Sequence, residues 1–144
     1  MDEKSRTEWL HCLQMSGGSI SGDVGHPASC FLIAEKTDDD VAIRRVAMAL
    51  MNAGCRDFHF CGSLRELWHD TFDRVDIERT SDEKDWALTC DYGSAEEFAR
   101  TITQEHAWCT DAPGDFYLIY DDEAMFGEVL RSLPMPKKLP DCRS

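Results

Sequence analysis

The chain has 144 residues, 42% of them hydrophobic, which is enough for one folded domain with a substantial core. Twenty-eight acidic residues against fifteen lysines and arginines leave a net charge of −13. Such a surface repels nucleic-acid phosphates and anionic lipid and favours a basic protein as partner. No apolar run is long enough to cross a bilayer, and the first ten residues do not resemble a secretory signal. We therefore expect a cytoplasmic protein that binds neither nucleic acid nor membrane.

No two of the seven cysteines are spaced C-x-x-C, so the chain has neither a zinc-knuckle nor a thioredoxin-type motif. Cys30, Cys55, Cys61 and Cys90 lie in or beside apolar runs that are typical of buried strands, so we predict reduced thiols in the core. Cys61 is also a candidate nucleophile, since it ends its strand beside a helix N-terminus and shares a strand face with His59. No third partner for that pair is identified.

Composition divides the chain into three segments. Near the N-terminus, residues 3–15 predict a short helix, and the Gly- and Ser-rich residues 16–29 predict a flexible connection. The segments are the N-terminal helix with its connection (1–29), an α/β domain (30–133) and a Pro-rich tail (134–144).

Within the α/β domain, strand and helix patterns alternate four times. Two S-x-x-E capping boxes, Ser63 with Glu66 and Ser94 with Glu97, mark helix starts. The strands are continuous apolar runs, which indicates that helices cover both faces of the sheet. We predict a small three-layer Rossmann-like or flavodoxin-like sandwich with a mostly parallel four-stranded sheet. Its strands are expected at 30–34, 57–62, 85–93 and 115–122, and its helices at 38–54, 63–76, from Ser94 onward, and after 122 as far as Leu133.

The Trp-His-Asp turn at residues 68–70 lies on the second of these helices. At 100° per residue, Leu64, Leu67, Trp68, Phe72 and Val75 form a stripe that faces the core. The opposite side carries acids and one histidine, and its His69–Asp73 spacing allows an i,i+4 pair. This side is a solvated face, a docking surface or, with a ligand from elsewhere, a metal site. The candidate partner-binding residues are Glu66, His69, Asp70, Asp73, Asp76 and Glu78.

A glycine that closes a strand, followed by Trp-His-Asp, resembles a motif of a small bacterial protein family to which no activity is assigned. Gly62, Trp68, His69 and Asp70 match that motif. In the family a second histidine follows the next strand, whereas this chain has TCDYG there. The resemblance therefore implies a bacterial protein and carries no activity with it.

The carboxyl ends of the predicted strands gather acids, which is where open parallel sheets bind ligands. CFLIAEK together with LIYDDEA resembles the Toprim pattern of metal-binding carboxylates, although the second element here is D-x-E in place of D-x-D. Asp121 and Asp122 equally suit a cap of the last helix, as Asp38–Asp40 suit a cap of the first. The alternative magnesium ligands are Glu35, Asp91, Asp121 and Glu123.

We predict a protein-binding module without catalytic residues, metal or cofactor, most concretely an immunity or antitoxin-like inhibitor of a basic partner. The acid-rich stretch 66–85 favours this function, because fixed negative charge can cover a basic surface. The alternative is a small magnesium-dependent enzyme that acts on phosphoesters at the carboxyl ends of the strands.

Overall fold

A six-stranded sheet forms the centre of the protein in the computed structural model, which describes residues 9–108 and 115–133. The sheet order is β2-β1-β6-β3-β4-β5, and every neighbouring pair is parallel except the β1–β2 hairpin. The elements in chain order are β1 (Leu10–Ser16), β2 (Ser19–Ile20), β3 (Pro27–Ile33), α2 (Asp40–Asn52), β4 (Asp57–Cys61), α3 (Arg65–Arg79), the 3₁₀ helix η1 (Glu83–Asp85), β5 (Leu88–Tyr92), α4 (Ala95–Trp108), β6 (Asp115–Tyr120) and α5 (Glu123–Ser132).

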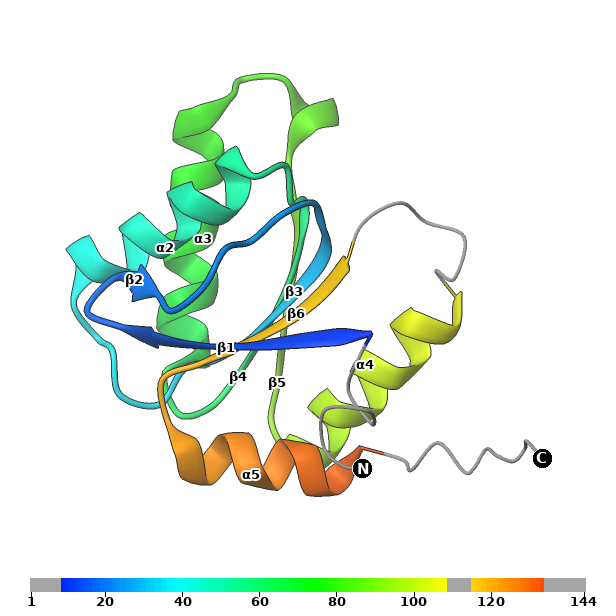
Figure 1. The fold of residues 1–144 in the computed structure, drawn as a ribbon. Coiled ribbons are helices and arrows are strands. Elements are labelled where there is room, and N and C mark those ends of the chain that lie inside the picture. Colours follow the sequence, from blue (N-terminus) through cyan, green and yellow to red (C-terminus); the bar gives the residue numbers. More distant parts are fainter. Residues whose placement is uncertain (1–8, 109–114, 134–144) are drawn as a thin grey trace.

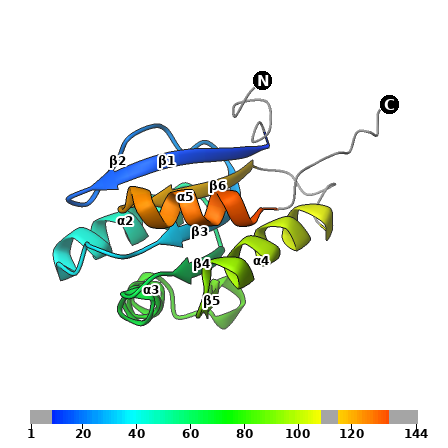
Figure 2. The ribbon, with the colours of Figure 1, turned by 90° about the horizontal axis from the view of Figure 1, so that it is seen from below.

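Helices cover both faces of the sheet, as the continuous apolar strands predict. Helices α2 and α3 pack on one face and α4 and α5 on the other. Figure 2 shows all four helices around the strands. The α/β class and the mostly parallel sheet are therefore confirmed. None of the helices in the described part of the chain combines the length and apolar character needed to cross a membrane.

The number of strands is larger than the four that were predicted, because the N-terminal segment joins the sheet. Residues 10–16 form strand β1 where a helix was predicted, and β1 pairs in parallel with β6, about one hundred residues away. Gly17 and Gly18, with φ of 56° and 91°, turn the chain into β2, so part of the predicted flexible connection is ordered. Residues 3–8 and the predicted tail at 134–144 lie outside the described residues.

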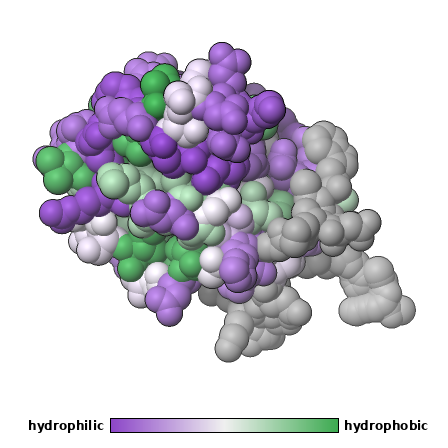
Figure 3. Space-filling model, turned by 90° about the horizontal axis from the view of Figure 1, so that it is seen from above, coloured by the Kyte–Doolittle hydropathy of each residue, from purple (hydrophilic) through white to green (hydrophobic). Residues whose placement is uncertain are grey.

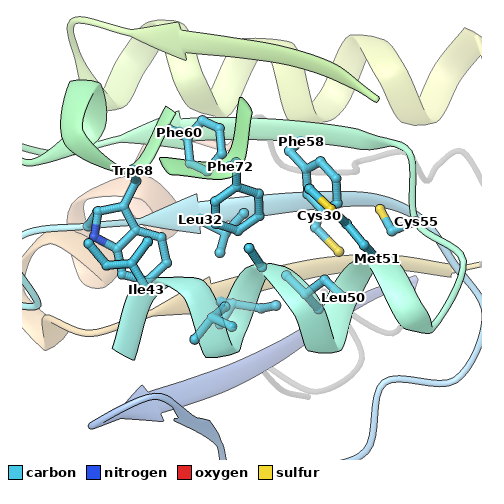
Figure 4. Close-up of a cluster of buried hydrophobic side chains, with 14 of the residues drawn as sticks. Cys30, Leu32, Ile43, Leu50, Met51, Cys55, Phe58, Phe60, Trp68 and Phe72 are labelled. Carbon is cyan, nitrogen blue, oxygen red and sulfur yellow. The ribbon is translucent and has the colours of Figure 1, made fainter. Parts of the chain in front are cut away.

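The larger core layer lies between the sheet and helices α2 and α3 (Figure 4). Trp68 and Phe72 of α3 are fully buried and pack with Phe58 and Phe60 of β4. Leu67 was predicted to join this stripe, but 37% of its surface is exposed because it lies on the outer side of α3. The core role of Trp68 is confirmed.

The start of α3 differs from the predicted capping box. Leu64 is the N-cap and no side chain caps the helix; instead the backbone N–H and the hydroxyl of Ser63 donate to Glu35. Gly62 has a φ of 109°, and a Cβ there would overlap the Ala34 carbonyl, so the chain needs glycine where β4 turns into α3. The second box forms at least in part, because the Glu97 N–H donates to Ser94 Oγ at 3.1 Å.

Candidate functional site

The edge of the sheet that usually binds ligands lies at the carboxyl ends of β3 and β6. These strands are neighbours, and the chain leaves them toward opposite faces, into α2 and α5 respectively. Asp121, the residue after β6, fills this point. Its carboxylate accepts the backbone N–H groups of Glu35, Lys36 and Thr37 at 2.8, 3.0 and 2.8 Å. Three donors of the kind that hold anionic ligands are thus satisfied by the chain's own carboxylate.

The other three alternative magnesium ligands also do not converge on a common point. Glu35 accepts the backbone N–H of Ser63 at 2.8 Å, Asp91 contacts His69 at 2.7 Å, and Glu123 lies exposed on α5. Within residues 9–108 and 115–133 these carboxylates do not form a group with metal-ligating spacing. The arrangement gives no support to a magnesium site at this edge.

Helix capping explains two of the neighbouring acids. Asp122 caps α5 by accepting the Met125 N–H at 2.9 Å, and Asp39 caps α2 by accepting the Ala42 N–H at 3.0 Å. The hydrogen bond from Met125 lowers the pKa of Asp122, with a smaller contribution from Lys36. Asp121 was predicted to share the cap of α5, but it binds the turn after β3 instead.

The Trp-His-Asp turn places its three side chains in three different environments. Trp68 is buried, and its indole N–H donates to the Thr37 carbonyl at 2.8 Å. His69 packs beside the edge strand β5, with its Nδ1 2.7 Å from Asp91 and its Nε2 3.0 Å from the hydroxyl of Thr89. Asp70 faces solvent. The turn is therefore a junction between core, edge strand and surface.

A hydrogen-bonded network joins α3 to β5 around His69. Thr89 donates to Asp73 at 2.8 Å, and Asp73 lies 3.5 Å from His69 Nε2, which confirms the predicted i,i+4 pair. The His69 ring stacks on Phe60, and a quarter of its side chain is exposed. Two carboxylates, of Asp73 and Asp91, thus flank one histidine on a half-exposed surface.

The six predicted partner-binding residues do not form one patch. Glu66 and Asp70 are exposed and make no hydrogen bond or ion pair with any residue the structure describes. Glu78 is exposed but pairs with Arg44 on the α2 side of α3. Asp76 is 4% exposed, and its carboxylate accepts from Arg79 and from the Ala87 backbone N–H. The residues that remain on the β5 side of α3 are Glu66, His69, Asp70 and Asp73.

Two apolar side chains lie exposed where the chain passes from α3 into β5. Trp86, 40% exposed, is held by an N–H···O bond to the Thr80 carbonyl, and Leu88 at the start of β5 is 65% exposed. Among the strands that the structure describes, β5 pairs only with β4, and none of them covers its outer backbone edge. Figure 3 views the end at which α3 leads into η1, and its upper part is predominantly hydrophilic with isolated hydrophobic side chains.

A second polar cluster lies on the other face of β4 and β5, under α4. His59 is 3% exposed; its Nε2 lies 2.9 Å from Asp57, its Nδ1 lies 2.8 Å from the Tyr92 hydroxyl, and Ser29 donates to Asp57 at 2.6 Å. Glu105 of α4 completes the group. Sequence reasoning missed this cluster, although an aspartate and a histidine two positions apart on a buried strand share one face and are a usable signal.

Burial raises the pKa of both carboxyl groups of this cluster, but their neighbours shift the two pKa values in opposite directions. Burial favours the neutral form of Asp57, but hydrogen bonds from His59 and Ser29 outweigh it and lower the Asp57 pKa. Burial and the charge of Asp57 both raise the pKa of Glu105. The two carboxyl groups therefore differ in how easily they lose a proton.

Three of the cysteines that the structure describes are core residues. Cys30, Cys55 and Cys61 are buried, Cys90 is half-buried, and all four are free thiols as predicted. Burial raises the pKa of Cys61 to about 11, the opposite of what a nucleophile needs. Cys109 and Cys142 lie outside the described residues.

Comparison with known proteins finds no matching family model, no matching curated protein and no matching solved structure. The candidate sites are therefore judged on their geometry and chemistry alone.

Proposed function

We propose that the chain binds a basic protein through the α3–β5 surface, which consists of Glu66, His69, Asp70, Asp73, Trp86 and Asp91. The observation that carries the proposal is that Glu66 and Asp70 are exposed acids without a described partner, beside the half-exposed Asp73 and Asp91. Charges that a fold does not neutralise internally are available to another molecule.

The sign of the local charge is clear whatever the protonation state of His69. One imidazolium faces the carboxylates of both Asp73 and Asp91, and the free carboxylates of Glu66 and Asp70 add to them. Together with the net charge of −13, this surface attracts cationic side chains at long range and hastens encounter with a basic partner.

Charge steers the encounter with a partner, and apolar contacts are needed to anchor it. Tight interfaces depend on a few aromatic or aliphatic anchors surrounded by polar contacts. Trp86 is exposed between the end of α3 and the start of β5, and the outer edge of β5, which no described strand covers, offers backbone N–H and C=O groups for further pairing. The surface thus combines steering charge with anchoring groups.

The most concrete form of the proposal is an immunity or antitoxin-like inhibitor in a bacterial cytoplasm, which holds a basic toxin by covering its cationic surface. Inhibition of this kind needs no catalytic residue, so we infer a binding module rather than an enzyme. The internal bonds of Asp121 agree with this inference, because they fill the usual ligand-binding edge of the sheet.

Affinity capture from the native host tests the proposal. The bait variant is Glu66→Lys/Asp70→Lys, and the matched control is Glu96→Lys/Glu97→Lys on α4, which makes the same charge change at exposed acids elsewhere. We expect wild type and control to retain the same basic protein and the α3 variant to lose it. Equal retention by both variants, or capture of no basic protein, contradicts the proposal.

A further inference from the structure

We propose that Asp57, His59 and Glu105 form a binding site for one divalent transition-metal ion of the Zn²⁺ class. One ligand atom from each side chain lies within 4.8 Å of the other two. Asp57 and His59 project from the same face of β4, and Glu105 reaches them from α4. No other group of three in the described ranges 9–108 and 115–133 has this spacing.

The chemistry of the three donors selects the ion. One imidazole and two carboxylates suit Zn²⁺ and related transition metals, whereas Mg²⁺ and Ca²⁺ prefer sites made of oxygen alone. Three protein ligands leave a fourth tetrahedral position for water. Part of the Asp57 side chain, 20%, is exposed, so the site has a path to solvent.

The surrounding residues orient the ligands in the way that metal sites require. The Nδ1 of His59 lies 2.8 Å from the Tyr92 hydroxyl; with Nδ1 donating to that hydroxyl, Nε2, which donates to Asp57 in this structure, would release its proton and present its lone pair to a metal. The ring also stacks on Phe31, with centroids 4.4 Å apart and planes 10° apart. Ser29 donates to Asp57 at 2.6 Å and fixes that carboxylate. Each of the two β4 ligands is therefore held by a second residue.

Glu105 is an independent indication that the cluster can hold a cation. It is half-buried, it approaches Asp57, and it makes no hydrogen bond or ion pair with any residue the structure describes. The two carboxylates repel each other, and His59 offsets only part of that repulsion. A divalent cation removes that repulsion and replaces the present contact between His59 Nε2 and Asp57.

Zinc titration of the full chain, purified without an affinity tag and stripped with a chelator, tests the site by calorimetry. The test variant is Glu105→Gln, which keeps the shape of the side chain and avoids disturbing the buried His59. Its control is Glu97→Gln, an exposed acid on the same helix. Thermal melts of all three proteins establish that each is folded.

We expect wild type and Glu97→Gln to bind one Zn²⁺ with equal affinity, and Glu105→Gln to bind at least about tenfold more weakly. Co²⁺ in the same site should show the visible bands of nitrogen and oxygen ligation, without the near-ultraviolet charge-transfer band of a thiolate. Absence of saturable binding, equal affinity of Glu105→Gln and wild type, or a thiolate band that assigns the metal to cysteines would overturn the proposal.

Discussion

Substitution of Asp121 by asparagine tests whether this residue closes the ligand-binding edge of the sheet. The native carboxylate accepts three backbone N–H groups, from Glu35, Lys36 and Thr37. Hydrogen bonds to a charged group contribute roughly 1.5–3 kcal/mol each. Asparagine keeps one acceptor oxygen and places an NH₂ group against the remaining donors. Because the turn is partly exposed, we expect a loss of about 2–4 kcal/mol in the free energy of unfolding.

Urea titration measures this loss, with tryptophan fluorescence and far-ultraviolet circular dichroism as two probes. Trp68 reports on the same turn, because its indole N–H donates to the Thr37 carbonyl. The matched control is Glu123→Gln, an exposed acid two residues away, which should change stability by less than about 0.5 kcal/mol. If Asp121→Asn is as stable as that control, the carboxylate does not hold the turn and the edge of the sheet is available to a ligand.

Three further outcomes follow from individual contacts. Gly62→Ala should lose at least about 2 kcal/mol in urea titration, since a φ of 109° and a backbone overlap both oppose a side chain; wild-type stability would contradict this. Asp76→Ala should lose about 3–5 kcal/mol, because it removes the nearly buried carboxylate to which Arg79 and the Ala87 N–H donate; a loss below about 1 kcal/mol would show that these bonds contribute little. In chelator-treated protein, Glu105→Gln should raise stability at neutral pH. The raised pKa of Glu105 means that folding opposes its charged form, so the gain should vanish below the ordinary pKa; a gain that persists there contradicts this cause.

Local patterns suffice for most of the main domain. The strands β3, β4, β5 and β6 and the helices between them follow from apolar runs, helical periodicity and capping residues. The helix α2 illustrates this, since its N-cap Asp39 and its buried face of Ile43, Val46, Ala47 and Leu50 are readable without any distant contact. Segments whose neighbours in sequence determine their structure are therefore predictable.

Contacts between residues far apart in the sequence explain the two structural features that the local patterns predict wrongly. Trp9, Leu10 and Leu13 fit a helix as well as a strand, and pairing with β6, at the other end of the chain, decides between them. Ser63 has a helix-capping sequence, yet Glu35 binds it. Tertiary hydrogen bonds here override a local signal.

The same distinction between local and long-range contacts applies to the candidate sites. Trp68 in the core and the His69–Asp73 pair follow from the helical wheel. The burial of Asp76 cannot be predicted from the helical wheel, because the groups that donate to it include the Ala87 N–H beyond the end of the helix. The joining of His59 to Glu105 depends on how α4 packs against the sheet, which no local pattern contains.

The association rate constant between the chain and its basic partner tests the central claim most directly. Stopped-flow mixing over a salt series would compare wild type, Glu66→Lys/Asp70→Lys and the control Glu96→Lys/Glu97→Lys, with thermal melts to confirm folding. We predict that the α3 variant associates at least about tenfold more slowly than the control at low salt, and that the difference shrinks as the Debye length falls to about 3 Å at 1 M. Equal rates for the two variants at low salt would show that the α3–β5 surface is not where the partner docks.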